Sequence, residues 1–600
     1  MNKALKISIF VFLGILASVG LGVWYASSFV NPTQLTKLLS SSVKEATGRE
    51  LAISGPVSLS VFPTISVRAE QVALSNASWA SNPNMLTLKQ IELDIRLMPL
   101  LKGSIEIGRI GLLGLQVNLQ TNKAGEGNWN LTPPGVETGK ADSATSSSDI
   151  NSSATFISYS AIDVVDTQIN YQDANQNTKV IQLPKLSVGI ADGSSNILMD
   201  MKYANYTLGL KGKTSLLRNA FRDWNLSPVK VNLDLDLTLN GKSLAITGAI
   251  SKQPQKLPQF QIDLNSKSFD LAPLAGSALV AGSTGKSSAV APPKAQGKYF
   301  FSDEALPFNL LPIADGSINI NIAELGIPDQ APFTNFKTTL QFKNDRIDAN
   351  DLSFNVGKGS AHAQLSISEI NRPMPKVALR GMAKDFTLEQ ILATTDSKAS
   401  VSGGDMRLAL NLKGSGVSPH QLMSQATGVI QIAMGQGRID SKFINKGGDF
   451  VITVFDAINP MYKKSNQTAL ECAVAYLPIN SGLVNIQNSV GVETDRLDIV
   501  LAGSVNLASE ALNLTINPRE KSGLTTGLDL AGLVKIEGTL QNPTTGVNKA
   551  GVVNSAVSIG LGFLTGGISI AAENAKSLAT KSQPCKSALH PWSDIYSVTK

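Results

Sequence analysis

Apolar and polar residues alternate along most of the chain after Gly48, which is the pattern of strands with one apolar face. The clearest example begins at Lys230, where every second residue is aliphatic and the residues between are polar. Its aliphatic members are Val231, Leu233, Leu235, Leu237 and Leu239. Asn240 and Gly241 follow, a pair that favours the two-residue turn of a hairpin. The pattern predicts a mainly β protein whose antiparallel sheet continues almost to the C-terminus.

A helical spacing precedes the strands. Asn31 and Pro32 provide an N-cap followed by proline, and Gly48 ends the pattern. The apolar residues between them recur every three or four positions, at Leu35, Leu38, Leu39, Val43 and Ala46. We therefore predict a short amphipathic helix over 31–48. Its polar face lacks the Lys and Arg of an interfacial anchor, so its apolar stripe is expected to pack on the first strands.

Residues 7–30 form an uncharged apolar run, longer than the ~20 residues that span a bilayer. Lys3 and Lys6 precede it and no Lys or Arg follows before Lys37, which places the tail in the cytoplasm and the body across the membrane. The alternative is a signal peptide cleaved near Ala26, but the apolar core of such a peptide is shorter than this run. Both interpretations export the body, and we prefer the uncleaved anchor.

Two stretches divide the body. Residues 133–155 and 275–297 are rich in small and polar residues and cannot bury enough apolar area to fold, so we predict flexible linkers. A second uncharged run, 551–572, contains many Gly, Ser and Thr residues, which favours a packed helix or end cap over a second span. The predicted segments are 1–30 (tail and anchor), 31–132 (N-terminal region), 133–155 (linker), 156–274 (β-rich middle region), 275–297 (linker), 298–545 (C-terminal β region) and 546–600 (apolar segment and tail).

The composition limits the possible partners. Charged residues are only 16% of the chain, against about 25% in an average protein, which favours sheet and turn over helix. The net charge of +6 is spread without a block of Lys or Arg and without interleaved aromatic residues. Nucleic acid is therefore not an expected partner.

The residues that could carry chemistry are few. His362, His420 and His590 stand apart from any acid or cysteine arrangement that would suggest a triad or a metal pair. The chain has no zinc-protease, nucleophile-elbow or dinucleotide motif, so we expect no catalytic residues, no metal and no cofactor. Two cysteines are too few for a metal cluster, and in an oxidising compartment we predict a disulfide between Cys472 and Cys585.

Alternation shows that one face of the sheet is apolar but does not show what covers that face. Two facing sheets could bury it in a dry sandwich, or one curled sheet could leave it open as a trough that receives acyl chains. From the pattern alone the sandwich is favoured, because it is the commoner way for antiparallel sheets to bury a face.

Three stretches carry a resemblance to a known family. The first is the apolar run and helix, followed by TGRELAISGPVSLSVFPTISVRAEQVALSNASW and IELDIRLMPLLKGSIEIGRIGLLGLQVNLQTNKAGEGNW. The second is FSDEALPFNLLPIADGSININIAEL, beginning at Phe301. The third comprises GSGVSPHQLMSQATGVIQIAMGQGRI, a stretch of strands beginning at Cys472, and the pair Pro584 and Cys585. In these stretches the sequence resembles the AsmA family of Gram-negative envelope proteins.

The resemblance implies an inner-membrane protein with a periplasmic β-rich body, related to TamB-type and chorein-like bridge proteins. It implies a transmembrane helix followed by an elongated, curled antiparallel sheet with a few short helices, and it favours the open groove over the sandwich. The implied partners are phospholipids, the inner membrane and outer-membrane assembly proteins. Representative groove candidates are Val231, Leu233, Leu235 and Leu237. The alternative function is a non-enzymatic scaffold whose strand edges pair with outer-membrane proteins. Because two linkers interrupt a body shorter than the long bridge proteins, a continuous conduit between membranes is in doubt.

Overall fold

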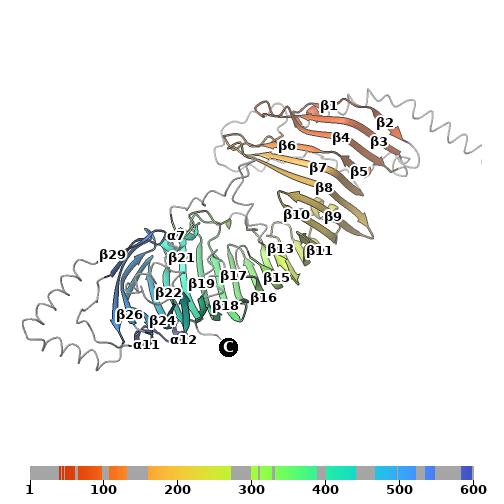
Figure 1. The fold of residues 1–600 in the computed structure, drawn as a ribbon. Helices are drawn as coiled ribbons and strands as arrows, with labels where there is room; N and C mark the ends of the chain where they lie inside the picture. The colour runs from red at the N-terminus through yellow and green to blue at the C-terminus, as the bar shows by residue number, and fades with distance from the viewer. Residues whose placement is uncertain are drawn as a thin grey trace, which may run out of the picture. The chain divides into compact units, whose positions relative to one another are not determined.

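Figure 1 shows the computed structural model of the chain, coloured from the N-terminus to the C-terminus. The structure describes residues 40–41, 43–45, 47–60, 65–96, 107–131, 160–271, 299–308, 311–327, 331–387, 401–440, 467–495, 497–521, 534–547 and 583–596. The predicted membrane run, both predicted linkers and the apolar run at 551–572 lie outside these residues. Within the described ranges, no helix is both long enough and apolar enough to cross a membrane.

The chain forms two compact units. The N-terminal unit comprises residues 1–255 and 273–287, and the C-terminal unit comprises 256–272 and 288–600. Each is built mainly of strands, with a few short helices, which confirms the predicted mainly β class.

In the N-terminal unit, hydrogen-bonded strands follow one another almost in chain order. They are β1 (Leu51–Ile53), β2 (Val57–Ser60), β3 (Ile65–Ser75), β4 (Asn84–Ile95), β5 (Ile107–Leu113), β6 (Gln116–Gln120), β7 (Ala161–Gln172), β8 (Thr178–Ala191), β9 (Ser194–Tyr203), β10 (Tyr206–Ser215), β11 (Val229–Leu239) and β12 (Lys242–Lys252). Both β1 and β2 pair with β3, and both β5 and β6 pair with β4 and with β7. A short helix, α4 (Leu217–Asp223), lies between β10 and β11 in the chain.

The C-terminal unit repeats this arrangement in a curled sheet (Figure 1). Its strands are β13 (Gln259–Ser266), β14 (Phe269–Asp270), β15 (Asp315–Gly326), β16 (Phe333–Lys343), β17 (Arg346–Val356), β18 (Gly359–Ser368), β19 (Lys376–Thr387), β20 (Val401–Gly403), β21 (Asp405–Ser415), β22 (Thr427–Met434), β23 (Gly437–Asp440), β24 (Gln467–Asn480), β25 (Leu483–Thr494), β26 (Leu497–Asn506), β27 (Ala511–Glu520), β28 (Val534–Thr539) and β29 (Pro543–Val547). Its helices are α7 (Pro419–Ser424), α11 (Pro584–Ala588) and α12 (Trp592–Ile595).

The prediction of an antiparallel sheet holds for most strand pairs but is incomplete, because each unit also contains a parallel pairing. In the N-terminal unit β5 and β6 pair with β7 in parallel, and in the C-terminal unit β13 and β14 pair with β15 in parallel. Parallel neighbours need a connection of about a dozen residues or more, whereas antiparallel ones can be joined by a tight turn. The segments 133–155 and 275–297 lie between these partners in the sequence and supply that length. The same low-complexity stretches therefore connect neighbouring strands that run in the same direction.

Two local predictions are confirmed. Asn240 and Gly241 have φ values of 47° and 81°, and Leu239 pairs with Lys242 on either side of them, as in the two-residue turn that Asn–Gly favours. Gly48 has φ 71° and its N–H donates to the carbonyl of Lys44 at 2.9 Å, which ends the helix before β1.

A line of kinks crosses the N-terminal unit. Gln71 of β3, Gly114 between β5 and β6, and Asp166 of β7 all have positive φ, at 52°, 66° and 56°. At each of them the pairing with the next strand is interrupted for one residue, while the register on the two sides stays the same. At Gln71 the apolar positions of β3 shift by one residue, from Ala69 to Val72, and those of β4 shift at the facing residue, so both strands keep their apolar side chains on one face. The sheet can therefore curl without exchanging its apolar and polar sides.

The best-packed core lies in the C-terminal unit. Residues from β24 to β28, among them Ile499, Ile516 and Ile536 at 0% exposure, form one cluster of buried aliphatic side chains. The equivalent face of β18 is only half-buried, at Leu365 for example. The C-terminal unit is thus densely packed toward its last strands and more open toward its first.

This difference predicts unequal costs of truncation. Ile516→Ala should destabilise the C-terminal unit by about 2–5 kcal/mol, since it leaves a cavity in a closed core. Leu365→Ala should cost only about 1 kcal/mol, because a half-buried side chain has less transfer free energy to lose. Native-state hydrogen exchange of peptides from β27 and β18 measures both losses. Equal losses would contradict the difference in packing.

Candidate functional site

The pairing register joins the apolar residues of successive strands into continuous rows. Starting from β2, direct partners in the N-terminal unit form the row Leu59, Val67, Leu93, Ile110, Ile162, Val188, Ile197, Gly212, Leu235 and Ile246. The neighbouring row is Val57, Ala69, Ile91, Leu112, Val164, Leu186, Met199, Leu210, Leu237 and Leu244. Every member except Gly212 has an apolar side chain, so an uninterrupted apolar band runs across the strands.

The opposite face of this sheet is polar and carries ion pairs between neighbouring strands. Arg68 of β3 lies 3.1 Å from Glu92 of β4, and Arg109 of β5 lies 2.7 Å from Asp163 of β7. Burial alone would raise the pKa of Asp163, but hydrogen bonds from Ser187 and Arg109 outweigh it and hold that pKa below its ordinary value of 3.8. The carboxylate therefore stays ionised at neutral pH, which keeps this face charged.

All four groove candidates of β11 lie on the apolar face. Val231 is buried, at 6% exposure, whereas Leu233, Leu235 and Leu237 are half-buried. Gly212 lies opposite Leu235, and a Cβ on Gly212 would meet the carbonyl oxygen of Asp234 at 2.1 Å. The residue opposite Leu235 must therefore lack a side chain.

No second layer covers this band among the described residues of the N-terminal unit. The extensive contacts there join hydrogen-bonded neighbours, except for a smaller contact of α4 with β11. The half-burial thus comes from neighbouring side chains of the same curled sheet. Within the N-terminal unit, the described strands form a curled sheet and not the facing sheets of a sandwich.

In the C-terminal unit, the side chains of one apolar row are half-buried in the earlier strands and buried in the last strands. Its members from β13 to β27 are Ile262, Ile318, Leu340, Ala349, Leu365, Leu379, Leu412, Gly428, Ile479, Val484, Val505 and Leu512. The leucines and isoleucines up to Leu412 are half-buried, whereas those from Ile479 onward are buried. Phe301 and Met423 pack against the closed end. Apolar surface remains accessible only along the earlier part of the row.

A strap at residues 299–306 holds Phe301 at this closed end. The carboxylate of Glu510, only 1% exposed, accepts hydrogen bonds from the N–H groups of Phe300 and Phe301 at 2.6 and 2.9 Å. The Nδ1 atom of His420 lies 3.5 Å from the same carboxylate, and the His420 ring stacks on Tyr299 with centroids 3.8 Å apart. Sequence reasoning missed this His–Glu contact because the two residues are distant in the chain and no local motif joins them.

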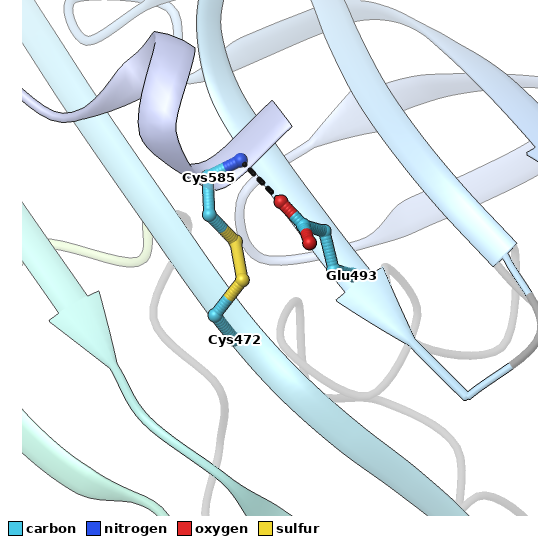
Figure 2. A group of neighbouring side chains, drawn as sticks. All are labelled: Cys472, Glu493 and Cys585. Atoms are coloured by element: carbon cyan, nitrogen blue, oxygen red, sulfur yellow. Dashed lines mark hydrogen bonds between the residues drawn. A yellow bond between two sulfur atoms is a disulfide. The ribbon is translucent and has the colours of Figure 1, made fainter. Parts of the chain in front are cut away.

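The opposite face of the last strands carries a second strap, formed by α11 and α12. Cys585 of α11 is joined to Cys472 of β24 by the expected disulfide, with Cα atoms 6.4 Å apart. Figure 2 shows the Cys585 N–H donating to the carboxylate of Glu493, at 3.0 Å. Since both sulfur atoms are bonded to each other, this group is a covalent clamp and offers no thiolate to a metal.

Aromatic residues extend the hold of this second strap. The His590 ring stacks on Tyr476 of β24 with centroids 3.7 Å apart, and the backbone N–H of His590 donates to the side-chain oxygen of Gln431 at 2.8 Å. The guanidinium of Arg407 lies 4.3 Å from the ring centroid of Trp592. These contacts fasten the strap to β21, β22 and β24, so they serve the structure of the closed end.

The side chain of Lys521 lies close to three carboxylates beside the disulfide. Its ammonium lies 2.6 Å from Glu471, 3.8 Å from Glu493 and 3.3 Å from Asp498. Burial raises the pKa of Asp498 above 3.8; Lys521 opposes this rise, while Glu493 and Glu471 add to it. Burial lowers the pKa of Lys521, but its bonds to Glu471 and Asp498 more than offset this, so that pKa lies above 10.5.

Removing the disulfide should loosen the second strap. The bond closes a sequence separation of 113 residues, so replacing both cysteines by alanine should cost roughly 3–5 kcal/mol by the chain-entropy estimate. Limited trypsin digestion at Lys586, with urea unfolding of the C-terminal unit, tests this. The reduced wild-type protein is the matched control and should behave like the variant; unchanged cleavage in both would sink the prediction.

Lys521→Gln should destabilise the C-terminal unit at pH 7 by about 1–2 kcal/mol, because partly buried carboxylates lose their counter-charge. The raised pKa of Lys521 means that its stabilisation is complete below pH 10.5 and is lost as the pH rises through the folded value. As the pH falls, the difference in stability between the variant and the wild type should shrink. The reason is that Asp498, whose pKa lies above 3.8, loses the negative charge that Lys521 compensates. Thermal melts of both proteins across pH 4–11 measure this difference in stability. A difference that does not change with pH would contradict this account.

Comparison with known proteins places the chain in a family. The model of the AsmA family matches residues 1–287 and 217–489, which together exceed half of the chain. A similar protein of Escherichia coli (strain K12), described as "AsmA family protein YhjG", is 26% identical over 240 residues, which make up 39% of this chain and 33% of that protein. The match thus spans about a third of the relative's length. No solved structure matches the chain. The matched residues include most of the strands that carry the apolar rows. Because the family model matches more than half of the chain, the chain belongs to the AsmA family.

Proposed function

We propose that this protein binds phospholipid acyl chains along the apolar band and transfers lipid in support of the outer membrane. The observation that carries the proposal is the half-buried aliphatic surface of the rows through Leu235 and Leu237, which no second layer covers among the described residues. In a soluble β protein such a face is normally packed. Its incomplete burial leaves apolar surface for a ligand.

The dimensions of the band suit an acyl chain. Successive strands lie about 4.8 Å apart, so the row from Leu59 to Ile246 extends roughly 40 Å across the sheet. Half of a bilayer's hydrocarbon core, which one acyl chain spans, is only about 15 Å thick. Each Å² of apolar surface removed from water contributes about 25 cal/mol, so a chain laid along the rows gains affinity from many weak contacts.

The polarity of the two faces supports a carrier role. The ion pairs Arg68–Glu92 and Arg109–Asp163 occupy the face opposite the band, so the charged side can face water while acyl chains contact the aliphatic side. The proposal needs no covalent step and no cofactor. It includes anchoring in the inner membrane through residues 7–30, with the body in the periplasm.

In-cell photo-crosslinking tests this proposal. A photoreactive amino acid at Leu235 should yield lipid adducts, because that side chain belongs to the apolar band. The matched control is Asp234, the adjacent residue on the polar face of the same strand, which should yield none. Mass spectrometry of the adducts identifies the lipid. Adducts at Leu235 that contain only protein would favour the assembly-scaffold alternative and overturn lipid carriage at this position.

A further inference from the structure

Two tryptophan side chains are exposed at one edge of the N-terminal unit. Trp79 and Trp129 are 39% and 44% exposed, although large aromatic side chains are usually well covered in a water-soluble domain. Trp79 follows the end of β3, and Trp129 follows the end of β6. Ser75 at the end of β3 pairs with Asn84 at the start of β4, and Asn118 of β6 donates to the carbonyl of Asn84 at 3.0 Å. Both tryptophans therefore belong to loops at the same strand ends.

A buried asparagine ties the two loops together. Asn128, at 0% exposure, donates from its side chain to Asn76 at 2.8 Å and to the carbonyl of Asn118 at 2.7 Å. Its side-chain oxygen accepts the N–H of Gln120 at 2.9 Å. Asn76 also closes the loop of Trp79 by donating to the carbonyl of Asn82 at 2.9 Å. The two tryptophans are thus presented by one hydrogen-bonded structure, so their exposure is built into the fold.

The other aromatic residues described at this edge are tyrosines. Tyr171 near the end of β7 lies with its ring centroid 6.3 Å from that of Trp129, and Tyr203 and Tyr206 flank the turn between β9 and β10. Trp and Tyr combine an apolar ring with a polar N–H or O–H group, and they concentrate where a surface meets the headgroup region of a bilayer. The aromatic chemistry of this edge therefore suits a lipid interface.

The chain enters the sheet from this same edge. The N–H of Ser75, at the end of β3, donates to the carbonyl of Glu50 just before β1, and Arg49 donates to the carbonyl of Asn128 at 3.5 Å. Only residues 31–39 separate the apolar run 7–30 from the first described residue. That length reaches at most about 30 Å when fully extended and about 14 Å as a helix. The anchor therefore keeps this edge close to the bilayer.

We propose that the edge bearing Trp79 and Trp129 docks onto the outer surface of the bilayer that residues 7–30 span, with the indole rings in the headgroup region. This inference rests on the membrane anchoring in the proposed function. Docking would set one end of the strands, and with it a side of the apolar band, at the source of lipid. The occupant of this edge is a phospholipid surface and not a protein.

The test uses the full-length protein in vesicles of phosphatidylethanolamine and phosphatidylglycerol. A photoreactive amino acid replaces Trp79 or Trp129 in turn. The matched control is Leu226, which is 79% exposed and follows α4, beyond the end of β10 at Ser215, at the opposite ends of the strands. Lipid adducts should form several-fold more at positions 79 and 129 than at 226. Equal yields at all three positions, or adducts of protein alone at 79 and 129, would overturn the docking.

A second readout separates this inference from lipid carriage. In the same vesicles, the probe at Leu235 reports on the band independently of the edge. Adducts at Leu235 without adducts at 79 and 129 would reject the docking and leave carriage standing; the reverse would reject carriage at that position and support the docking. Trp79→Ala with Trp129→Ala should lower the adduct yield at Leu235 several-fold without changing the folding of the unit, which circular dichroism checks.

Discussion

The pairing register is the constraint on which the rest of this structure depends. Side chains alternate between the faces of a sheet, so a slip of one residue in any strand would move its aliphatic side chains to the polar face. In the N-terminal unit the register holds apolar residues opposite one another from Leu59 to Ile246 without a polar interruption. Where the sheet kinks, residues of positive φ such as Gln71 and Asp166 shift the alternation by one step, and the paired strand shifts at the same level, so the faces are preserved. The continuity of the apolar band follows from this combination.

A one-layered sheet leaves its apolar face incompletely buried. In the C-terminal unit the two ends of the sheet differ in how far this face is covered. Its first strands keep half-buried residues such as Leu379. Its last strands close into a core around Ile499 and Ile516, sealed by Phe301 from the first strap. The closed end provides the packing on which a stable unit depends, while the earlier strands retain accessible apolar surface. Dense packing and accessible apolar surface therefore belong to different strands of this sheet.

The closed end is also reinforced on its polar face. The disulfide, the stacked rings of His590 and Tyr476, and the Lys521 cluster all hold the C-terminal segment against the last strands. Burying carboxylates is costly unless a cation accompanies them, and Lys521 is that cation for Asp498 and its neighbours. The ion pairs of Lys521 thus account for the burial of these carboxylates, and the stacking of His590 on Tyr476 belongs to the same reinforcement.

The sequence by itself determined the strands, the hairpin at Asn240 and Gly241, the helix end at Gly48 and the shared face of Val231 to Leu237. These features depend on residues close together in the chain, through the alternation of side chains and the φ preferences of single residues. The apolar run at 7–30 and the cysteine count also sufficed to predict the disulfide. The parallel pairings could not be predicted, because parallel and antiparallel neighbours satisfy the same alternation. Nor could the open and closed parts of the apolar face be told apart, since Leu379 and Leu512 stand in equivalent alternating patterns. Only the tertiary structure, by bringing Phe301, Glu510 and His420 together from distant segments, decided which part of the face closes.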